Sequence, residues 1–231
     1  MKAMILAAGF GIRLRPLTET TPKPLIEING KPIILYTLEA LKKAGVRDIV
    51  INLHHLGYKI RQTLGNGSQF DVNIQYSDEP EIMGTAGALL LARKFLTEPF
   101  YLINADILFD LNLTILPSML IEKNADAVMV LCKAKQDQKA LANVYMDTHG
   151  YVRSLFKAYP GADAYIFTGI QFLKPNVIEH IPVDIKQPST TMHMYPDMIR
   201  KGKLIAGYVH NGFWIDIGNP ENLETAKRLF K

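Results

Sequence analysis

The sequence predicts an α/β fold in which a mixed, mostly parallel sheet is flanked by helices. Two observations predict it. Short apolar runs alternate with segments that repeat apolar residues at helical spacing, and the first run, residues 3–8, ends directly at Gly9. With 231 residues, 48% of them hydrophobic, the chain can bury the core that such a sheet needs. Ligands of these sheets bind at the carboxyl ends of the strands, which points to the Gly9 loop and to Asp106.

The first half of the chain consists of repeated strand and helix patterns, as βαβ units require. The strands are predicted at residues 3–8, 48–53, 72–76, 100–104 and 127–131. The helices are predicted at residues 33–43, 56–64, 85–95 and 114–123, and Gly45 stops the first of them after Lys42 and Lys43.

The pattern changes after about residue 135. Residues 144–147 and 152–155 predict a β-hairpin with a short turn, and residues 165–173 predict a further strand. Helices are predicted at residues 176–181 and 191–201, and strands at 204–209 and 213–215. Asn219, Pro220 and Glu221 predict the start of a last helix that runs to the chain end, because they supply an N-cap, a first-turn proline and a first-turn acid. We expect the second half to extend the sheet and cover one end of it.

Composition excludes several classes of protein. The 26 Lys and Arg residues against 22 Asp and Glu residues give a formal net charge of +4, a mild basic excess without a long basic stripe, so nucleic acid is not an expected partner. The single cysteine, Cys132, excludes an internal disulfide and a thiolate zinc cage and is predicted to be a buried strand thiol. No uncharged apolar run approaches the roughly 18 residues of a membrane span, so a cytoplasmic protein with no membrane partner is expected.

The strongest local signal is the glycine-rich loop after the first strand. Gly9 and Gly11 allow backbone N–H groups to approach phosphate oxygens, and Arg13 and Lys23 can neutralise those oxygens. A dinucleotide fingerprint would need glycine where Leu14 stands, which disfavours a dehydrogenase. The Walker pattern is also absent, because each Gly-Lys pair is followed by proline or leucine.

Four segments, in order, resemble the sugar-1-phosphate nucleotidyltransferases. They are Gly-Phe-Gly-Ile-Arg-Leu-Arg-Pro-Leu-Thr with Pro-Lys-Pro at residues 22–24, then residues 84–87, 104–106 and 214–220. The resemblance implies a Rossmann-like nucleotide-diphospho-sugar transferase fold in a single domain. Residues 1–135 would form a nucleotide-binding lobe and residues 136–231 a smaller sugar-binding lobe with the C-terminal helix. The β-helix domain that many members carry downstream is not expected here.

The implied reaction joins a nucleoside triphosphate to a sugar 1-phosphate and releases pyrophosphate. The attacking phosphate oxygen is already an anion, so the chemistry needs positioning and charge neutralisation more than a general base. The resemblance assigns Arg13, Lys23, Asp106 and Asp216 to catalysis. Asp106 and Asp216 would also hold Mg²⁺, with Asp110 as a nearby rival.

The resemblance also implies two sets of binding residues. The nucleotide-binding set is Leu6, Ala8, Gly9, Gly11, Arg13, Lys23, Glu79, Gly84 and Thr85. The sugar-phosphate-binding set is Asn143, Lys157, Thr168, Gly169, Gln171 and Trp214. Lys157 departs from the family pattern, because the usual Glu-Lys-Pro is here Phe-Lys-Ala. Alternatives remain open for three residues: Glu79 as a solvent-exposed acid, Gln171 as an outward-pointing strand residue, and Trp214 as a structural residue.

The substrates stay open between two pairs. Residues 84–87 resemble mannose-1-phosphate guanylyltransferases, and residues 51–57 resemble the N-acetylmuramate-1-phosphate uridylyltransferases of the cell wall. Glu79 fits either base, because a carboxylate accepts two hydrogen bonds from guanine or one from uracil. His54 and His55 lack the spacing of a metal site. We expect a monomer or small homo-oligomer, and the rival from another class is a non-catalytic nucleotide sensor or regulatory partner subunit.

Overall fold

The computed structural model describes residues 1–134 and 141–229. The chain forms two compact units, each described by itself. Unit 1 contains Met1–Ile82, Ile103–Leu113 and Gly212–Lys231, and unit 2 contains Met83–Leu102 and Thr114–Asn211. These units divide the chain elsewhere than the boundary predicted near residue 135. The assignment of the two lobes to nucleotide and sugar stays a prediction.

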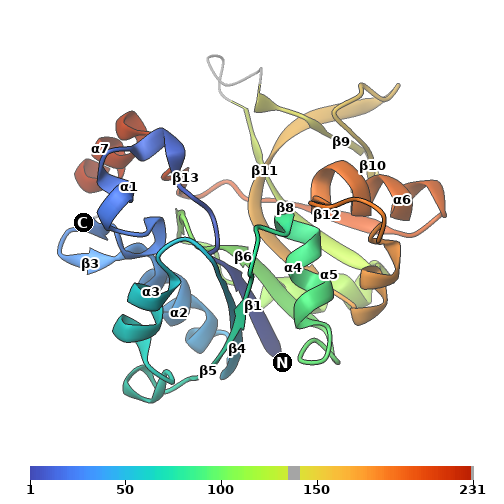
Figure 1. Cartoon of the computed structure of the whole chain (residues 1–231). Helices are drawn as coiled ribbons and strands as arrows, with labels where there is room; N and C mark the ends of the chain where they lie inside the picture. The colour runs from blue at the N-terminus through green and yellow to red at the C-terminus, as the bar shows by residue number, and fades with distance from the viewer. Residues whose placement is uncertain (135–140, 230–231) are drawn as a thin grey trace. The chain divides into compact units, whose positions relative to one another are not determined.

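Unit 1 contains three neighbouring parallel strands of the main sheet, β1 (Lys2–Leu6), β4 (Asp48–Leu53) and β5 (Asn73–Asp78), with β4 in the middle (Figure 1). The helices α2 (Ile33–Lys43) and α3 (Gly57–Leu64) accompany it. The strand at residues 48–53 has the predicted bounds. The first strand ends at Leu6, two residues earlier than predicted, because the N–H of Ala7 leaves the ladder and donates to the side chain of Asn52.

Between β1 and α2 the chain forms elements that periodicity did not predict. They are the 3₁₀ turns η1 (Ile12–Leu14) and η2 (Lys23–Leu25), the short helix α1 (Leu17–Thr20), and a two-stranded ribbon of β2 (Glu27–Ile28) and β3 (Lys31–Pro32). A third 3₁₀ turn, η3 (Ser68–Phe70), lies before β5. Each is too short for a repeat of apolar residues to show, and prolines interrupt the segment.

A second ribbon in unit 1 joins distant parts of the sequence. β7 (Ile107–Phe109) pairs in antiparallel fashion with β13 (Trp214–Asp216), so that Asp216 lies opposite Ile107. The last helix, α7 (Pro220–Leu229), begins as predicted, since the Asn219 side chain accepts a hydrogen bond from the N–H of Asn222 at 2.8 Å. One apolar core supports these elements: Leu14, Ile26, Ile28, Ile33, Leu108, Ile217, Leu223 and Ala226.

Unit 2 contains a mixed sheet. β12 (Ile205–Val209) runs parallel to β8 (Ala127–Lys133), β8 pairs antiparallel with β11 (Ala162–Leu173), and β11 pairs antiparallel with β9 (Val144–Asp147). The predicted hairpin is confirmed, because β9 pairs with β10 (Val152–Leu155) over the predicted residues. β6 (Phe100–Asn104) begins in unit 2 and ends in unit 1. Parallel pairing in one unit and mixed pairing in the other agree with the predicted α/β class.

The helical elements of unit 2 are α4 (Gly84–Ala92), α5 (Ile115–Glu122), the 3₁₀ segment η5 (Pro175–His180), the π-helical segment η6 (Thr190–Met194) and α6 (Tyr195–Arg200). Helices were predicted at residues 176–181 and 191–201. The first is instead a 3₁₀ helix and the second changes type at Tyr195.

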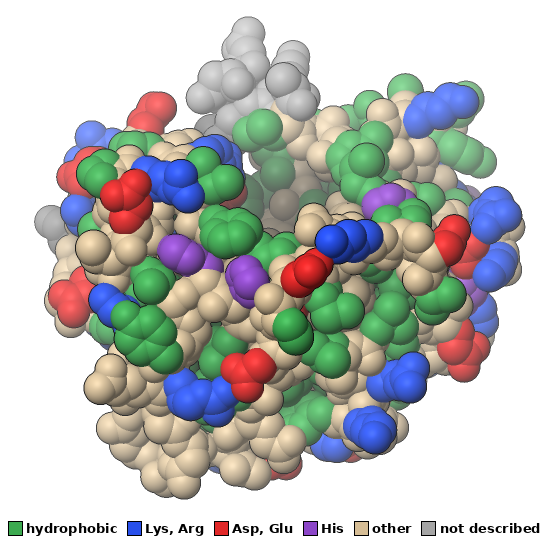
Figure 2. Space-filling model, viewed as in Figure 1, with side chains coloured by type: hydrophobic (Ala, Val, Ile, Leu, Met, Phe, Trp, Pro, Cys, Tyr) green, Lys and Arg blue, Asp and Glu red, His purple; other side chains and the backbone are tan. Residues whose placement is uncertain are grey.

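Two sequence-based expectations concern burial and surface. Cys132 lies in β8 as predicted but is half-buried, which corrects the expected buried thiol. Among the described residues no helix is long and apolar enough to cross a membrane. On the face drawn in Figure 2, the basic side chains of the described residues are scattered among acidic and neutral ones rather than joined in a stripe.

Candidate functional site

The glycine-rich loop lies at the carboxyl end of β1, as the strand-end rule requires. The loop turns at Gly11, whose φ of 63° lies in the left-handed region that favours glycine. A Cβ at this position would lie 2.8 Å from Cγ2 of Thr18, and the buried Thr18 hydroxyl donates to the Gly11 carbonyl at 2.9 Å. Gly9 is exposed, and a Cβ added there would meet no atom within 4 Å. The loop therefore presents backbone to solvent while Thr18 fixes its curvature.

A backbone hydrogen bond brings the turn that carries Asp106 next to the glycine-rich loop. The N–H of Ala105, in the turn after β6, donates to the carbonyl of Leu6 at 3.0 Å. This bond places Asp106 beside the carboxyl end of β1. At the other end of the turn, the carbonyl of Asp106 accepts a hydrogen bond from the N–H of Ile217 at 2.8 Å, which draws in the chain around Asp216.

Lys23 joins the two carboxylates that were expected to meet. Its Nζ donates to Oδ2 of Asp106 and lies 3.9 Å from Oδ1 of Asp216. The Lys23 side chain is only 13% exposed, held in η2 between two prolines. One ammonium thus faces two carboxylates from separate parts of the sequence. Their roles in catalysis stay predictions.

The surroundings of Asp216 disfavour its ionised form. Burial and the neighbouring charge of Asp106 raise the pKa of Asp216, while Lys23 and Arg13 oppose the rise. Oδ1 of Asp216 is inaccessible to water and has no hydrogen-bond partner among the described residues. Such an atom is costly unless a cation or a proton satisfies it. The described residues contain no group of three or more His, Cys, Asp or Glu side chains that could hold a metal, so a cation here would rely on two carboxylates and further oxygens from substrate or water.

The side chains of Arg13 and Asp216 both lie beside Gly218. A Cβ added to Gly218 would lie 2.7 Å from Nη2 of Arg13 and 3.0 Å from both carboxylate oxygens of Asp216. Only glycine therefore leaves room for the guanidinium and the carboxylate together. The carbonyl of Asp216 is fixed as well, because the side chain of Asn222 donates to it at 2.6 Å.

Asp110, the rival for a metal ligand, lies at the opposite end of β7 from Asp106. Its N–H donates to the carbonyl of Phe213 at 3.1 Å, which closes the far end of the β7–β13 ribbon. It also lines a cavity of about 490 Å³ together with Tyr36 and Lys43 of α2. The geometry thus favours Asp106 over Asp110 as the partner of Asp216.

Glu79 is buried, which corrects the alternative of a solvent-exposed acid. It is 5% exposed, and its Oε1 accepts a hydrogen bond from Nδ2 of Asn52 at 2.7 Å. Oδ1 of the same Asn52 accepts from the N–H of Ala7, next to Leu6 and Ala8 of the nucleotide loop. The structure therefore brings the carboxyl ends of β1, β4 and β5 together through Asn52.

Gly84 and Thr85, the remaining nucleotide-binding predictions, belong to unit 2. Gly84 has a φ of 72°, and a Cβ there would lie 2.6 Å from the carbonyl oxygen of Pro188. The Thr85 hydroxyl accepts a hydrogen bond from the N–H of Thr190 at 2.9 Å. Both residues thus hold the start of α4 against the segment before α6. A nucleotide contact for them stays a prediction.

The predicted sugar-binding residues divide into two groups. Asn143 and Lys157 lie at the same end of the β9–β10 hairpin, since the N–H of Phe156 donates to the carbonyl of Asn143 at 2.6 Å. Lys157 is exposed, and Trp214, in β13 of unit 1, is half-buried. These three side chains are at least partly accessible to a ligand.

The other group is engaged inside unit 2. The Thr168 hydroxyl donates to the carbonyl of Val130 at 2.8 Å, and Gly169, with a φ of 83°, lies in a bulge of β11 against β8. Gln171 is 1% exposed, and its Oε1 accepts a hydrogen bond from the hydroxyl of Tyr195 at 2.5 Å. Gln171 therefore does not point outward, which corrects that alternative. Sugar contacts for this group stay predictions.

Sequence reasoning missed several residues that shape the site. Gly218 was part of a recognised motif, but only the position of Arg13 shows why it is glycine. His54 and His55 were set aside, yet a ring nitrogen of each is 2.8 Å from a backbone carbonyl, that of Glu79 for His54 and that of Thr18 for His55. The Phe10 ring, at the loop, lies 5.4 Å from the His54 ring and 5.5 Å from the His55 ring, measured between centroids. Residues 52–55 could have been noted as a cluster of polar side chains at the end of a strand. They were tested only for the spacing of a metal site, which they lack.

A glycine loop at a strand end, with the cations Arg13 and Lys23 and the carboxylates of Asp106 and Asp216 beside it, is the arrangement expected of a phosphate-binding nucleotide site. The chain belongs to the nucleotidyl transferase family, whose sequence model matches residues 2–231. The family expected from the sequence motifs is thus confirmed.

Among its relatives, the chain is 33% identical over 235 residues to the mannose-1-phosphate guanylyltransferase catalytic subunit beta of Danio rerio and 34% identical over 235 residues to a mannose-1-phosphate guanyltransferase of Yarrowia lipolytica. Each match covers 100% of this chain and 64% of the relative. The chain therefore spans somewhat less than two thirds of the length of these relatives.

Solved structures agree on the fold. HddC from Yersinia pseudotuberculosis, complexed with GMP-PN, is 27% identical with a TM-score of 0.77, and the match covers 100% of this chain and 99% of that one. A UDP-glucose pyrophosphorylase complexed with UDP-glucose is 21% identical with a TM-score of 0.78, covering 99% of this chain and 97% of that one. The predicted nucleotide-diphospho-sugar transferase fold, with its helix-flanked mixed sheet, is confirmed.

Proposed function

We propose that this protein transfers a guanylyl group from GTP to mannose 1-phosphate, releasing pyrophosphate and forming GDP-mannose. A phosphate oxygen of the sugar 1-phosphate attacks the α-phosphorus of GTP, and the bond from that phosphorus to the bridging oxygen of the β-phosphate breaks. The observation that carries the proposal is the meeting of Lys23, Asp106 and Asp216 beside the glycine loop. The relatives named mannose-1-phosphate guanylyltransferases support the choice of base and sugar.

The charged residues divide the work of bringing two polyanions together. Backbone N–H groups of the Gly9–Gly11 loop would bind phosphate oxygens, and Arg13, in the turn that follows the loop, would neutralise the leaving pyrophosphate. Lys23 would bridge the phosphates of the two substrates, exchanging its carboxylate partners for phosphate oxygens. No residue is required to remove a proton from the attacking oxygen, because that oxygen is already an anion.

Asp106 and Asp216 would hold a divalent cation, and Mg²⁺ fits them best. Two carboxylates with additional oxygens from phosphate and water match the ligands that this ion prefers. Oδ1 of Asp216, which is buried without a hydrogen-bond partner among the described residues, supports a cation at this place. When bound, the ion would supply positive charge to the triphosphate. We infer Mg²⁺ dependence from this chemistry.

Pyrophosphate release tests the proposal directly. The protein is incubated with Mg²⁺ and each combination of GTP, UTP, dTTP, CTP or ATP with mannose 1-phosphate or N-acetylmuramate 1-phosphate. We expect release with GTP and mannose 1-phosphate, and a fall of about 100-fold or more in the rate of Asp106→Asn. Asp110→Asn, at the other end of β7, is the matched control and should keep the rate of the unaltered protein.

Three results would contradict parts of the proposal. Release with UTP and N-acetylmuramate 1-phosphate alone would show that the base and the sugar are wrong. Loss of activity in Asp110→Asn but not in Asp106→Asn would show that the metal assignment is wrong. Nucleotide binding without turnover in any combination would identify a sensor or a regulatory subunit instead of an enzyme.

A further inference from the structure

We infer that Asn52 is a positioning residue that orients the carboxylate of Glu79 toward the base and thereby sets a preference for guanine. The inference deepens the proposed function, on which it rests, by naming the residue that controls base selection. Its support is the set of contacts that Asn52 makes with the nucleotide loop and with Glu79, and the contacts that fix the Glu79 backbone.

The side chain of Asn52 links two structures that a nucleotide would meet. Its Oδ1 accepts a hydrogen bond from the N–H of Ala7 at 2.8 Å, and its Nδ2 donates to Oε1 of Glu79 at 2.7 Å. Asn52 and Glu79 are 4% and 5% exposed, so both contacts are shielded from water. The amide has one possible orientation, since an N–H group can face only Oδ1 and a carboxylate requires a donor. Asn52 therefore fixes the distance of the Glu79 carboxylate from the loop.

Two hydrogen bonds fix the backbone of Glu79. One is made with Leu53, the last residue of β4, and the other with His54, which follows that strand. The N–H of Glu79 donates to the carbonyl of Leu53 at 2.8 Å. The carbonyl of Glu79 lies 2.8 Å from Nδ1 of His54, and because a carbonyl oxygen can only accept, the N–H of this ring nitrogen is the donor. With the main chain fixed in this way, the buried hydrogen bond from Asn52 orients the carboxylate.

An oriented carboxylate discriminates bases by the number of donors it meets. Guanine presents two adjacent donors on its pairing edge, N1–H and the exocyclic amine, whereas hypoxanthine lacks the amine and uracil offers only N3–H. A carboxylate held in one orientation accepts both hydrogen bonds of guanine, and one that rotates loses the second. Asn52 should therefore affect discrimination between GTP and ITP, which differ only in that amine.

The test measures binding of GTP and ITP by calorimetry, without sugar phosphate, to the unaltered protein, Asn52→Ala and Asn73→Ala. Asn73 is a matched control, because its Nδ2 also donates to a carboxylate, that of Asp48 at 3.1 Å, at the opposite ends of the same two strands. We expect the unaltered protein and Asn73→Ala to bind GTP at least about tenfold more tightly than ITP. In Asn52→Ala the ratio should fall to about threefold or less, because the triphosphate contacts of the two ligands are the same.

A second variant and a kinetic measurement separate positioning from folding. Asn52→Asp keeps an acceptor for Ala7 but places a carboxylate against Glu79, so it should also lose the GTP preference, whether or not Asn52→Ala folds. In turnover, Asn52→Ala should raise the KM for GTP by about tenfold and leave kcat within about threefold. A general loss of structure would instead lower kcat.

The two proposals fail in different ways. An unaltered GTP-to-ITP ratio in both Asn52 variants, with pyrophosphate release intact, overturns the role of Asn52 and leaves the proposed function standing. A ratio that falls as expected in a protein that releases no pyrophosphate overturns the proposed function alone. Equal binding of GTP and ITP by the unaltered protein overturns the role of Asn52, and absence of GTP binding overturns both.

Discussion

At the scale of the residue, the negative charge of Asp216 that the proposed cation site needs also destabilises the folded protein. Burial and the charge of Asp106 raise the pKa of Asp216. The Asp216 carboxylate therefore binds a proton more tightly in the folded protein than in the unfolded chain. Ionised Asp216 therefore lowers the free energy of unfolding at neutral pH. The cost disappears as the pH falls through the raised pKa, where the carboxyl is protonated in the folded state. A bound cation removes the same cost without a proton.

Replacing this carboxylate should stabilise the protein while removing the metal response. We expect Asp216→Asn to raise the free energy of unfolding at pH 7 by about 1 kcal/mol in the absence of divalent ions. Mg²⁺ with GTP should raise the Tm of the unaltered protein but raise that of the variant less. Asp78→Asn, which breaks an exposed pair with Arg61, is the control and should leave Tm and the metal response unchanged. A lower Tm for Asp216→Asn without metal would contradict the electrostatic argument.

Gly218 gives a second prediction at this scale, one of geometry rather than charge. Its Cβ in Gly218→Ala would meet the end of the Arg13 side chain, which is flexible, so the protein should fold with a loss of less than about 1 kcal/mol. The displaced guanidinium and carboxylate should nevertheless lower kcat/KM by about tenfold or more. Urea unfolding and turnover, measured on the same preparation, check both parts. Unchanged turnover would show that the spacing of Arg13 and Asp216 is not critical.

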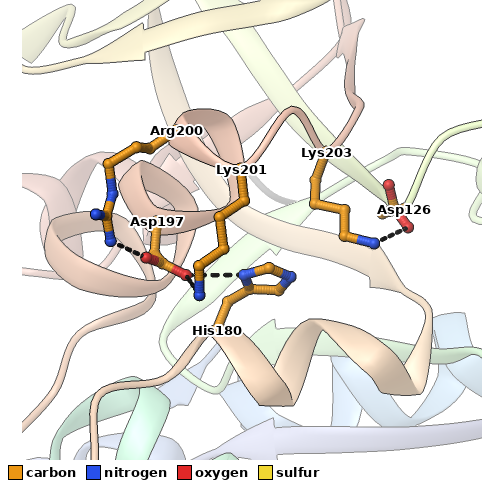
Figure 3. A network of polar contacts seen from close by, with 6 residues as sticks. All are labelled: Asp126, His180, Asp197, Arg200, Lys201 and Lys203. Atoms are coloured by element: carbon orange, nitrogen blue, oxygen red, sulfur yellow. Dashed lines mark hydrogen bonds and ion pairs between the residues drawn. The ribbon is translucent and has the colours of Figure 1, made fainter.

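At the scale of the element, Asp197 fastens η5 to α6 in unit 2. Its carboxylate accepts hydrogen bonds from Lys201, His180 and Arg200, and these donors lower its pKa (Figure 3). The carboxylate thus contributes stability at every pH above the ordinary Asp pKa of about 3.9. That stability is lost as the pH falls through the depressed pKa.

The stability of this network is measurable. We expect Asp197→Asn to lower the free energy of unfolding at pH 7 by about 1–2 kcal/mol, most of it from the hydrogen bond with the 8%-exposed His180. Between about pH 4 and pH 2 the variant should lose less stability than the unaltered protein. Asp71→Asn, whose partner Lys42 lies on the surface, is the control and should leave Tm unchanged. Equal acid sensitivity of Asp197→Asn and the unaltered protein would contradict the network.

Regular elements were predicted well and short irregular ones were not. β4 and β6 have their predicted bounds, because a run of apolar residues closed by turn residues marks both ends of a buried strand. η1 and η2, which carry Arg13 and Lys23, were missed as elements although both residues were identified. A single turn has no period, so only the phosphate chemistry of its residues pointed to them.

At the scale of the whole molecule, unit 1 is assembled from three separate parts of the sequence. Each part contributes charged residues to the site: the first supplies Arg13 and Lys23, the second Asp106 and the third Asp216. The β7–β13 ribbon and the core around Leu108 and Ile217 hold these parts together. No boundary drawn at one point along the chain can describe such a unit, which is why a division near residue 135 does not coincide with it.

The fold class, the family and the types of charged residue at the site could be predicted from the sequence alone. The spacing of apolar residues and the presence of phosphate-binding residue types are local properties, so they can be read from short stretches of the sequence. The folded structure was needed to show which residues meet: Lys23 faces both carboxylates, Gly218 makes room for Arg13, and Asn52 joins Ala7 to Glu79. These contacts join residues far apart in the sequence, and their geometry arises only when the strand ends and the ribbon pack together.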